Sequence, residues 1–153
     1  GHAIEVGHRW TLFAFAPDVA PGDTTSAMWF MLDTLRNDPA SPIKRCIEAG
    51  QNPDSLLDLR AIFQQGFRDI AWESLHPALR PAKGKYGLTD YEKVFCTDGT
   101  VNPDIYDLRG IDRGQGALIL VRPDQYISQI LPLSQTDVLF SHLNSVWSGK
   151  IGV

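Results

Sequence analysis

Two apolar segments separated by four residues constrain the fold of this sequence more than any other feature. Gly116 to Val121 (GALILV) is short, apolar and rich in aliphatic residues, and Tyr126 to Leu131 (YISQIL) alternates less regularly. Both patterns are typical of β-strands. Between them, Pro123 presets φ for the first central position of a turn, and Asp124 is a favoured turn residue. The sequence therefore predicts a β-hairpin.

Three earlier segments are also predicted to be strands. Arg9 to Ala16 (RWTLFAFA) is apolar on both faces, so we expect a central strand that is covered on each side. Leu56 to Gln64 alternates, and a helical crossover from the first segment would make the two strands parallel. Its apolar face carries Leu57, Leu59, Ala61 and Phe63. Tyr91 to Cys96 (YEKVFC) is a shorter candidate strand.

The first two segments with helical signals lie between the predicted strands at 9–16 and 56–64. Asp23 or Thr24 is suited to cap a helix that runs to about Asn37. Ser41 to Ala49 is predicted to be a second, short helix, because proline lies in its first turn and glycine follows its end.

Three later segments are also read as helix or loop. Phe67 to Pro81 is interrupted by proline, so we expect a broken helix or an ordered loop. Pro103 to Leu108 is predicted to form a short helical turn before a glycine. Ser134 to Asp137 resembles a capping box that opens a terminal helix. The apolar stripe of that helix carries Val138, Leu139, Leu143 and Val146.

The order of these elements predicts an α/β fold with a thioredoxin-like layer, in which helices flank a mixed β-sheet on both faces. No internal repeat or linker divides the chain, so we expect residues 1–153 to form a single domain. Gly1-His2 without an initiator methionine is typical of a tag remnant, which suggests a fragment of a longer protein. The alternative is a complete small protein with a processed start.

Composition excludes several classes of partner. The net charge is −4, and a phosphate-binding surface needs a positive patch, so nucleic acid and anionic membranes are not expected. The basic segment Arg80 to Lys85 is interrupted by proline and glycine and is interpreted as a solvated loop. The two cysteines lack a CxxC spacing, which suits a reducing cytoplasm. No membrane-spanning run or signal peptide is visible in the sequence.

The sequence lacks the thiol that a thioredoxin-like oxidoreductase needs. Such an enzyme keeps a cysteine at the helix start after its first strand, where the positive end of the helix lowers the thiol pKa. Here that place, Ala16 to Asp23, has no cysteine, so disulfide or peroxide chemistry at that site is excluded unless a distant cysteine moves into it. Cys46 and Cys96 lie in a predicted helix and strand and are interpreted as small buried hydrophobes.

Other reactive residues do not form a recognisable site. None of the histidines has a second ligand three or four residues away, so no metal site is predicted. They are His2, His8, His76 and His142. Gly110 to Gly116 precedes a strand, so it is interpreted as a tight turn and not as a phosphate-binding loop. Ser134, Asp137 and His142 fall on one predicted helix without a nucleophile elbow. We therefore assign no catalytic, cofactor-binding or metal-ligating residue.

Six blocks of the sequence carry a family resemblance. They are HRWTLFAFA at 8–16, LDLRAIFQQ at 57–65, YEKVF at 91–95, DLRGIDR at 107–113, GALILVRPD at 116–124 and ILPL at 130–133. Together they resemble the C-terminal domain of FAD-dependent phenol hydroxylases, most closely the 3-hydroxybenzoate 4-monooxygenase branch. The resemblance covers roughly residues 8–147 and is most specific over 107–133.

The resemblance implies a thioredoxin-like domain with a structural and dimerisation role that is inactive in isolation. FAD and NADPH would bind elsewhere in the full-length hydroxylase, which would act on phenol or 3-hydroxybenzoate. The expected partners are the flavin- and substrate-binding domains of the same chain and a second subunit. Two alternatives stay open: a stand-alone thioredoxin-like binding module, and a redox protein without a CxxC motif.

Two groups of residues could serve such contacts. Opposite charges in Asp107 to Arg109 and in Asp112-Arg113 are interpreted as a local ion-pair set, with contact to a flavin domain or a second subunit as the alternative. Trp29 and Phe30 are adjacent and diverge on a helix, so we expect one of them or Trp72 to face a partner domain.

Overall fold

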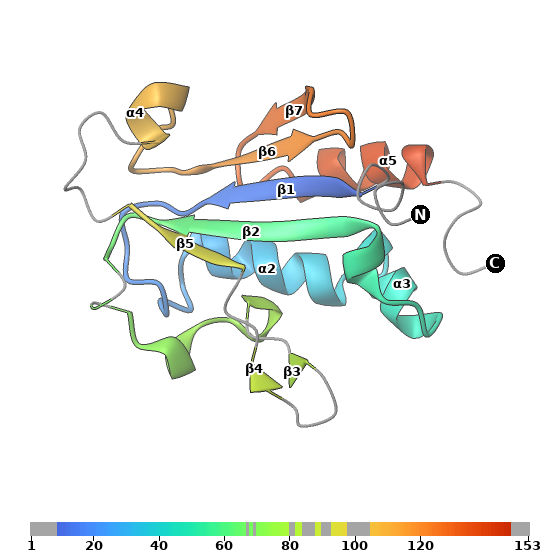
Figure 1. Ribbon diagram of the computed structural model, residues 1–153, viewed down its shortest axis with the longest axis horizontal. Coiled ribbons are helices and arrows are strands. Elements are labelled where there is room, and N and C mark those ends of the chain that lie inside the picture. Colours follow the sequence, from blue (N-terminus) through green and yellow to red (C-terminus); the bar gives the residue numbers. More distant parts are fainter. Residues whose placement is uncertain are drawn as a thin grey trace.

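The computed structural model describes residues 9–66, 68, 70–79, 82–83, 88–89, 93–97 and 105–147 (Figure 1). Several predictions fall outside these residues. They concern His2 and His8, the tag remnant, most of the basic loop at 80–85, and the predicted starts of a strand at Tyr91 and of a helix at Pro103.

A five-stranded mixed sheet forms the centre of the fold. Its strands are β1 (Trp10–Phe15), β2 (Leu57–Phe63), β5 (Val94–Cys96), β6 (Ala117–Val121) and β7 (Ile127–Leu131). The order across the sheet is β5-β2-β1-β6-β7. Strands β1, β2 and β5 are parallel, and β6 and β7 form an antiparallel hairpin beside β1. The predicted hairpin and the parallel pairing of the first two strands are confirmed. A separate pair, β3 (Ala82–Lys83) and β4 (Leu88–Thr89), lies outside this sheet.

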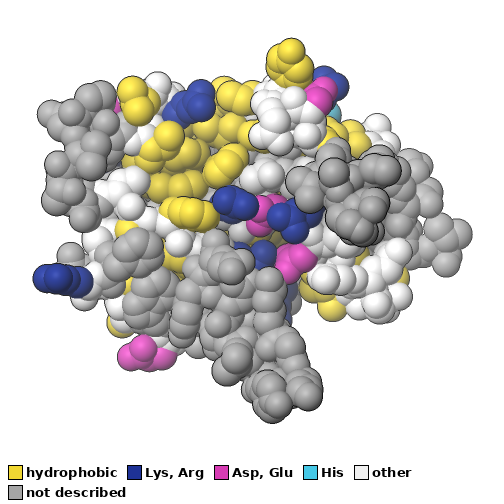
Figure 2. Space-filling view, in the orientation of Figure 1, with side chains coloured by type: hydrophobic (Ala, Val, Ile, Leu, Met, Phe, Trp, Pro, Cys, Tyr) yellow, Lys and Arg dark blue, Asp and Glu magenta, His cyan; other side chains and the backbone are white. Residues whose placement is uncertain are grey.

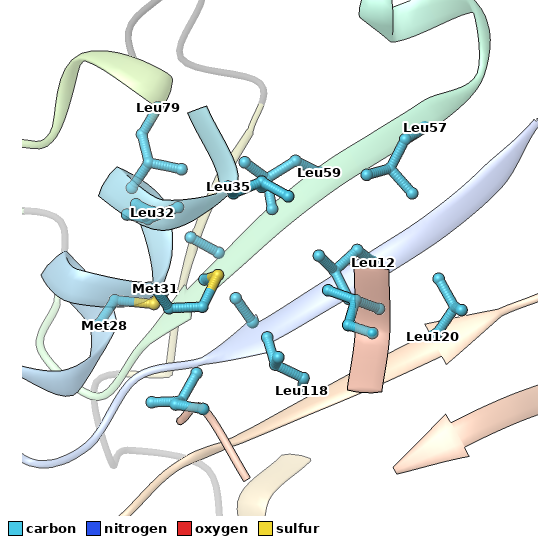
Figure 3. Close-up of a cluster of buried hydrophobic side chains, with 14 of the residues drawn as sticks. Leu12, Met28, Met31, Leu32, Leu35, Leu57, Leu59, Leu79, Leu118 and Leu120 are labelled. Atoms are coloured by element: carbon cyan, nitrogen blue, oxygen red, sulfur yellow. The ribbon is translucent and has the colours of Figure 1, made fainter. Parts of the chain in front are cut away.

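Three helices cover one face of the sheet. They are α2 (Ala27–Asn37), α3 (Pro42–Glu48) and α5 (Thr136–Val146). Apolar side chains of α2 meet those of β1, β2 and β6 in the main core (Figure 3). The predicted apolar face of β2 is buried in this core. A short 3₁₀ turn at Pro53–Ser55 precedes β2. Two more, at Trp72–Ser74 and Pro77–Leu79, agree with the predicted broken helix or ordered loop at 67–81.

The other face carries a single short helix among the described residues, α4 (Ile105–Arg109). The α/β class and the mixed sheet are therefore confirmed, but the two faces are covered unequally. Phe13, predicted to be covered on its side of β1, is only half-buried. Both faces of β1 are apolar, so the sequence pattern does not distinguish the covered face from the other.

Two predicted helix starts were wrong. Helix α2 is capped by Ser26, whose Oγ accepts the Trp29 N–H at 3.1 Å, and not by Asp23 or Thr24. Asp23 instead accepts bonds from the backbone N–H and hydroxyl of Thr25, which closes a turn before the helix.

At the start of α5 the residue Gln135 takes the N-cap position without a side-chain hydrogen bond, so the predicted capping box is absent. The predicted start of α3 is confirmed, because Ser41 caps it and Pro42 lies in its first turn.

Candidate interface

The sheet face opposite α2, α3 and α5 presents a continuous band of apolar side chains, here called the open face. Residues paired across neighbouring strands point to the same side of a sheet. The pairing therefore links side chains from all five strands in one layer. The pairs are Phe95 with Ile62, Ile62 with Phe15, Phe13 with Ile119, Ile119 with Ile130, and Val121 with Ile127.

An irregularity in the hairpin extends this layer to the sheet edge. The register of β6 and β7 shifts between Leu120 and Val121, so that Val121 pairs with Ile127. A bulge of this kind places two residues of one strand opposite one residue of the other. As a result both Ile127 and Ile130 lie on the open face, where they are 46% and 62% exposed.

The open face is hollowed between α4 and the turn of the hairpin. The hollow has a volume of about 540 Å³. Figure 2 shows hydrophobic side chains gathered over the part of the sheet next to α4, with charged side chains at their border. The residues lining the hollow on the sheet are Phe13, Phe15, Arg60, Ile62, Phe95, Thr97, Ile119, Val121, Gln125 and Ile127, and those on α4 are Ile105 and Arg109. Apolar surface gathered in a single patch of this kind marks an interaction site more often than scattered exposed residues do.

Tyr106 fixes α4 over one end of the open face. Its side chain is fully buried and packs edge-on against Phe15, with ring centroids 5.4 Å apart. The hydroxyl donates to the carbonyl oxygens of Ala16 at 2.7 Å and Ile62 at 2.9 Å, at the ends of two parallel strands. The guanidinium of Arg113 lies 5.3 Å from the ring centroid of Tyr106. Tyr106 therefore anchors the one helix that, among the described residues, covers part of this layer.

Replacing Tyr106 with phenylalanine is expected to lower the free energy of unfolding by only about 1 kcal/mol. Both carbonyl oxygens keep another donor, because Ala16 O also accepts from Gln64 Nε2 and Ile62 O accepts from the Ala16 N–H. Tyr106→Ala should cost roughly 3–5 kcal/mol, because the cavity cost is then added. Urea denaturation of both variants measures the two losses. If the phenylalanine variant were as unstable as the alanine variant, the hydroxyl hydrogen bonds, and not the packing of the ring, would supply most of the stability from Tyr106.

Charged residues border the open face mostly as paired groups. Asp58 is nearly buried and accepts from Arg60 at 2.7 Å and Arg9 at 3.2 Å. Arg60 also lies over the ring of Phe95, 5.5 Å from its centroid. At the hairpin turn Arg122 pairs with Asp124 at 2.7 Å, and both are exposed.

The predicted ion-pair set near α4 is confirmed. Arg113 pairs with Asp107 at 3.1 Å. Asp112 accepts from the backbone N–H groups of Gly114 and Gln115, which shapes the turn into β6. The segment from Gly110 to Gly116 is thus a turn, as predicted, and both of its terminal glycines have positive φ.

The two cysteines differ in exposure. Cys46 is completely buried in the main core, as predicted, and burial raises the pKa of its thiol. Cys96, which was also predicted to be buried, is only half-buried at the end of β5.

We expect Cys46 to resist alkylation until the protein unfolds, because only an accessible thiolate reacts quickly. Labelling with iodoacetamide followed by peptide mass spectrometry should give a rate for Cys46 roughly 100-fold below that of an exposed thiol. Cys96 is the internal comparison and should react faster. In denaturant the two rates should converge. Rapid native labelling of Cys46 would show that the core near α3 opens readily.

His76 lies between two 3₁₀ turns, outside helix and strand, and its side chain is buried. Its Nε2 lies 2.6 Å from Asp33 Oδ1 on α2, and its Nδ1 accepts the Ala78 N–H at 3.0 Å. Because Nδ1 is an acceptor, the proton resides on Nε2 and points at Asp33. The ring also packs edge-on against Trp29, with centroids 4.7 Å apart. This histidine therefore connects the 3₁₀ turn at 77–79 to α2. His76 and Asp33 are 43 residues apart, so no rule based on sequence spacing could predict their contact.

His142 is half-buried on α5. It bonds to Ser128 of β7 at 3.0 Å and packs against Trp10, and not against Ser134 or Asp137. The residues that a hydrolytic triad would need are therefore not brought together. Within the described ranges no group of three histidine, cysteine or acidic side chains is placed to hold a metal ion. Nor does any helix there have the length and apolarity to cross a membrane.

The side chains of the open face are the functional candidates that sequence reasoning missed. Alternation along β1 was visible, but no pattern showed that α4 is too short to cover the layer. Of the predicted partner-facing aromatics, Phe30 is 63% exposed on α2, whereas Trp29 is half-buried against His76.

Comparison with known proteins gives consistent matches along the chain. Residues 1–150 match the family described as phenol hydroxylase, C-terminal dimerisation domain. The chain is 44% identical over 146 residues to 3-hydroxybenzoate 4-monooxygenase of Comamonas testosteroni, covering 95% of this chain and 23% of that protein. It is 30% identical over 135 residues to the FAD-dependent monooxygenase terD of Aspergillus terreus, covering 86% of this chain and 22% of that protein.

A third relative is phenol 2-monooxygenase fsqG of Aspergillus fumigatus, 29% identical over 150 residues, covering 95% of this chain and 24% of the relative. The chain thus spans about a quarter of the length of the relatives that it matches. Since the family match extends over nearly all of its residues, the chain belongs to the family of phenol hydroxylase C-terminal dimerisation domains.

Proposed function

We propose that this chain is the C-terminal, thioredoxin-like part of an FAD- and NADPH-dependent monooxygenase that hydroxylates an aromatic ring. In that enzyme its role is to join subunits and to pack against the flavin- and substrate-binding domains. The observation that carries this role is the open face, an apolar layer that, within the part of the chain that the structure describes, one short helix covers only in part. Exposure of such a surface to water is unfavourable, and covering it with another protein surface lowers the free energy.

The strand arrangement supports the thioredoxin-like part of the proposal. Two parallel strands joined through helices, followed by an antiparallel hairpin and a terminal helix, follow the order expected from the sequence. The segment that follows β1 has no cysteine at the start of α2. A fold of this type without its thiol favours a packing role over redox chemistry.

The names of the relatives support the chemistry of the whole enzyme. Phenol and 3-hydroxybenzoate are the substrates that these names suggest, with the latter favoured by the higher identity. FAD would supply the oxygen-transfer chemistry in the other domains. The low cysteine content and negative net charge support a cytoplasmic location without nucleic-acid or membrane partners.

Expression of the full reading frame tests this proposal. The purified protein should show a bound-flavin visible spectrum, and phenol or 3-hydroxybenzoate should stimulate its oxidation of NADPH. A colourless product of the present size would contradict the proposal and indicate an independent binding module. Substrate preference between the two phenols follows from the same assay.

A further inference from the structure

We propose that the open face is the contact surface between two copies of this chain, with α4 of each copy lying in the hollow of the other. The two-fold axis runs across the strands, so that the copies stack face to face in opposite strand directions. This inference rests on the proposed dimerisation function and identifies the surface that performs it.

The dimensions of the open face favour this arrangement. Five residues of strand span roughly 17 Å, and a helix with its side chains is about 10 Å wide. Helix α4 therefore covers about half of the strand length, above Phe15, Ile62 and Ile119. The less covered half, where Phe13 and Val121 are partly buried and Ile127 is exposed, borders the hollow, into which we place one more short helix. A second α4 in that place would complete the layer.

The outer side of α4 has the chemistry that this position requires. Tyr106 points into the sheet, and Leu108, two residues later, lies on the opposite side and is 68% exposed. In the face-to-face arrangement Leu108 of one copy contacts Val121 and Ile127 of the other. A two-fold contact must match a surface to itself, and a projecting leucine beside an apolar hollow meets that condition.

Charges at the border agree with the same arrangement. Arg109 lines the hollow from α4, and Asp124 lies at the tip of the hairpin. Reversing the strand direction between copies brings α4 of one copy to the hairpin tip of the other. Arg109 then approaches Asp124 of the second copy, and the contact is repeated by symmetry. Opposite charges at an interface rim fix its register.

The size of the face suits the core of a dimer interface. Five strands about 4.8 Å apart and about 17 Å long form a layer of roughly 400 Å², of which α4 leaves about half, roughly 200 Å², uncovered in one copy. In the proposed dimer this half and the outer side of α4 are both buried. A stable interface buries about 800 Å² on each partner, with an apolar core inside a polar rim. The other exposed hydrophobics, Phe30 and Ile47, lie on α2 and α3. They are isolated residues and do not form a comparable layer.

The test uses the full-length protein and two single variants, Leu108→Asp and Ile127→Lys. Both residues are exposed in one copy, so neither change should unfold the domain. Phe30→Asp on α2 is the matched control, because its exposure of 63% is close to that of Leu108. In sedimentation velocity each face variant should raise the dimer dissociation constant at least about 100-fold, as expected for a buried interface residue. The control should remain a dimer.

Mixing the two face variants provides a second measurement. A mixed dimer has one contact in which the two substituted side chains meet with opposite charges, and one in which the native Leu108 meets the native Ile127. We expect the mixture to dimerise more tightly than either variant alone. Dimeric variants within a dimeric wild type would overturn this inference and leave the proposed function intact. A monomeric wild type would instead overturn the proposed dimerisation. Loss of flavin with an unchanged dimer would assign the open face to the flavin domain and overturn this inference.

Discussion

Replacing Gly116 with alanine is expected to lower the free energy of unfolding by more than about 3 kcal/mol. Gly116 has φ +70°, a conformation that disfavours any side chain. A Cβ there would press into the carbonyl oxygen of Phe15 and approach Pro17 N to 3.1 Å. Neither backbone can move away, because Phe15 pairs with Ala117 in the sheet.

Gly110→Ala is the matched control for this prediction. Gly110 has a similar φ of +65°, but nothing lies within 4 Å of its added Cβ. This variant should therefore cost only about 1 kcal/mol, the conformational part alone. Urea denaturation followed by circular dichroism gives both values. Equal losses would mean that the close approach of β1 to the turn at 116 is not maintained in solution.

Replacing Leu12 with alanine should destabilise the domain by roughly 3–5 kcal/mol. Leu12 is completely buried at the centre of β1, with Leu59 and Leu120 beside it on the neighbouring strands (Figure 3). Strands on both sides and helices above hold the surrounding atoms, so the cavity cannot collapse easily. The same loss should appear in thermal and urea denaturation.

Leu108→Ala is the comparison for Leu12→Ala, with both stabilities measured on the monomer. Its side chain is exposed, so its loss should change the stability of one copy by less than about 0.5 kcal/mol. Dimer dissociation should respond to it instead. If Leu12→Ala were as mild as Leu108→Ala, the main core would not be the principal source of stability.

The parts of the fold that could be predicted depend on local rules. The hairpin followed from two apolar runs and a Pro-Asp turn, and the buried face of β2 followed from alternation. The short helix α3 followed from Ser41 and Pro42 at its start. In each case the relevant signal lies within a few residues.

The predictions that failed needed long-range information. Four consecutive residues before α2, from Asp23 to Ser26, are of types that cap helices, and the choice of Ser26 depends on the turn that Asp23 and Thr25 form. No sequence pattern predicted the burial of His76, which depends on Asp33 on a different element. The open face depends on how little of a sheet a five-residue helix can cover. Sequence patterns show which residues are apolar, but not which of them a neighbour leaves uncovered.

The mass of the chain in solution tests the central claim most directly. Sedimentation equilibrium of residues 1–153 over a range of concentrations should give about twice the monomer mass of 17.0 kDa. The observed mass should fall toward the monomer value on dilution, with one dissociation constant. A mass of 17.0 kDa at every concentration, from a sample whose circular dichroism shows that it is folded, would contradict the claim that this chain is itself the dimerising unit.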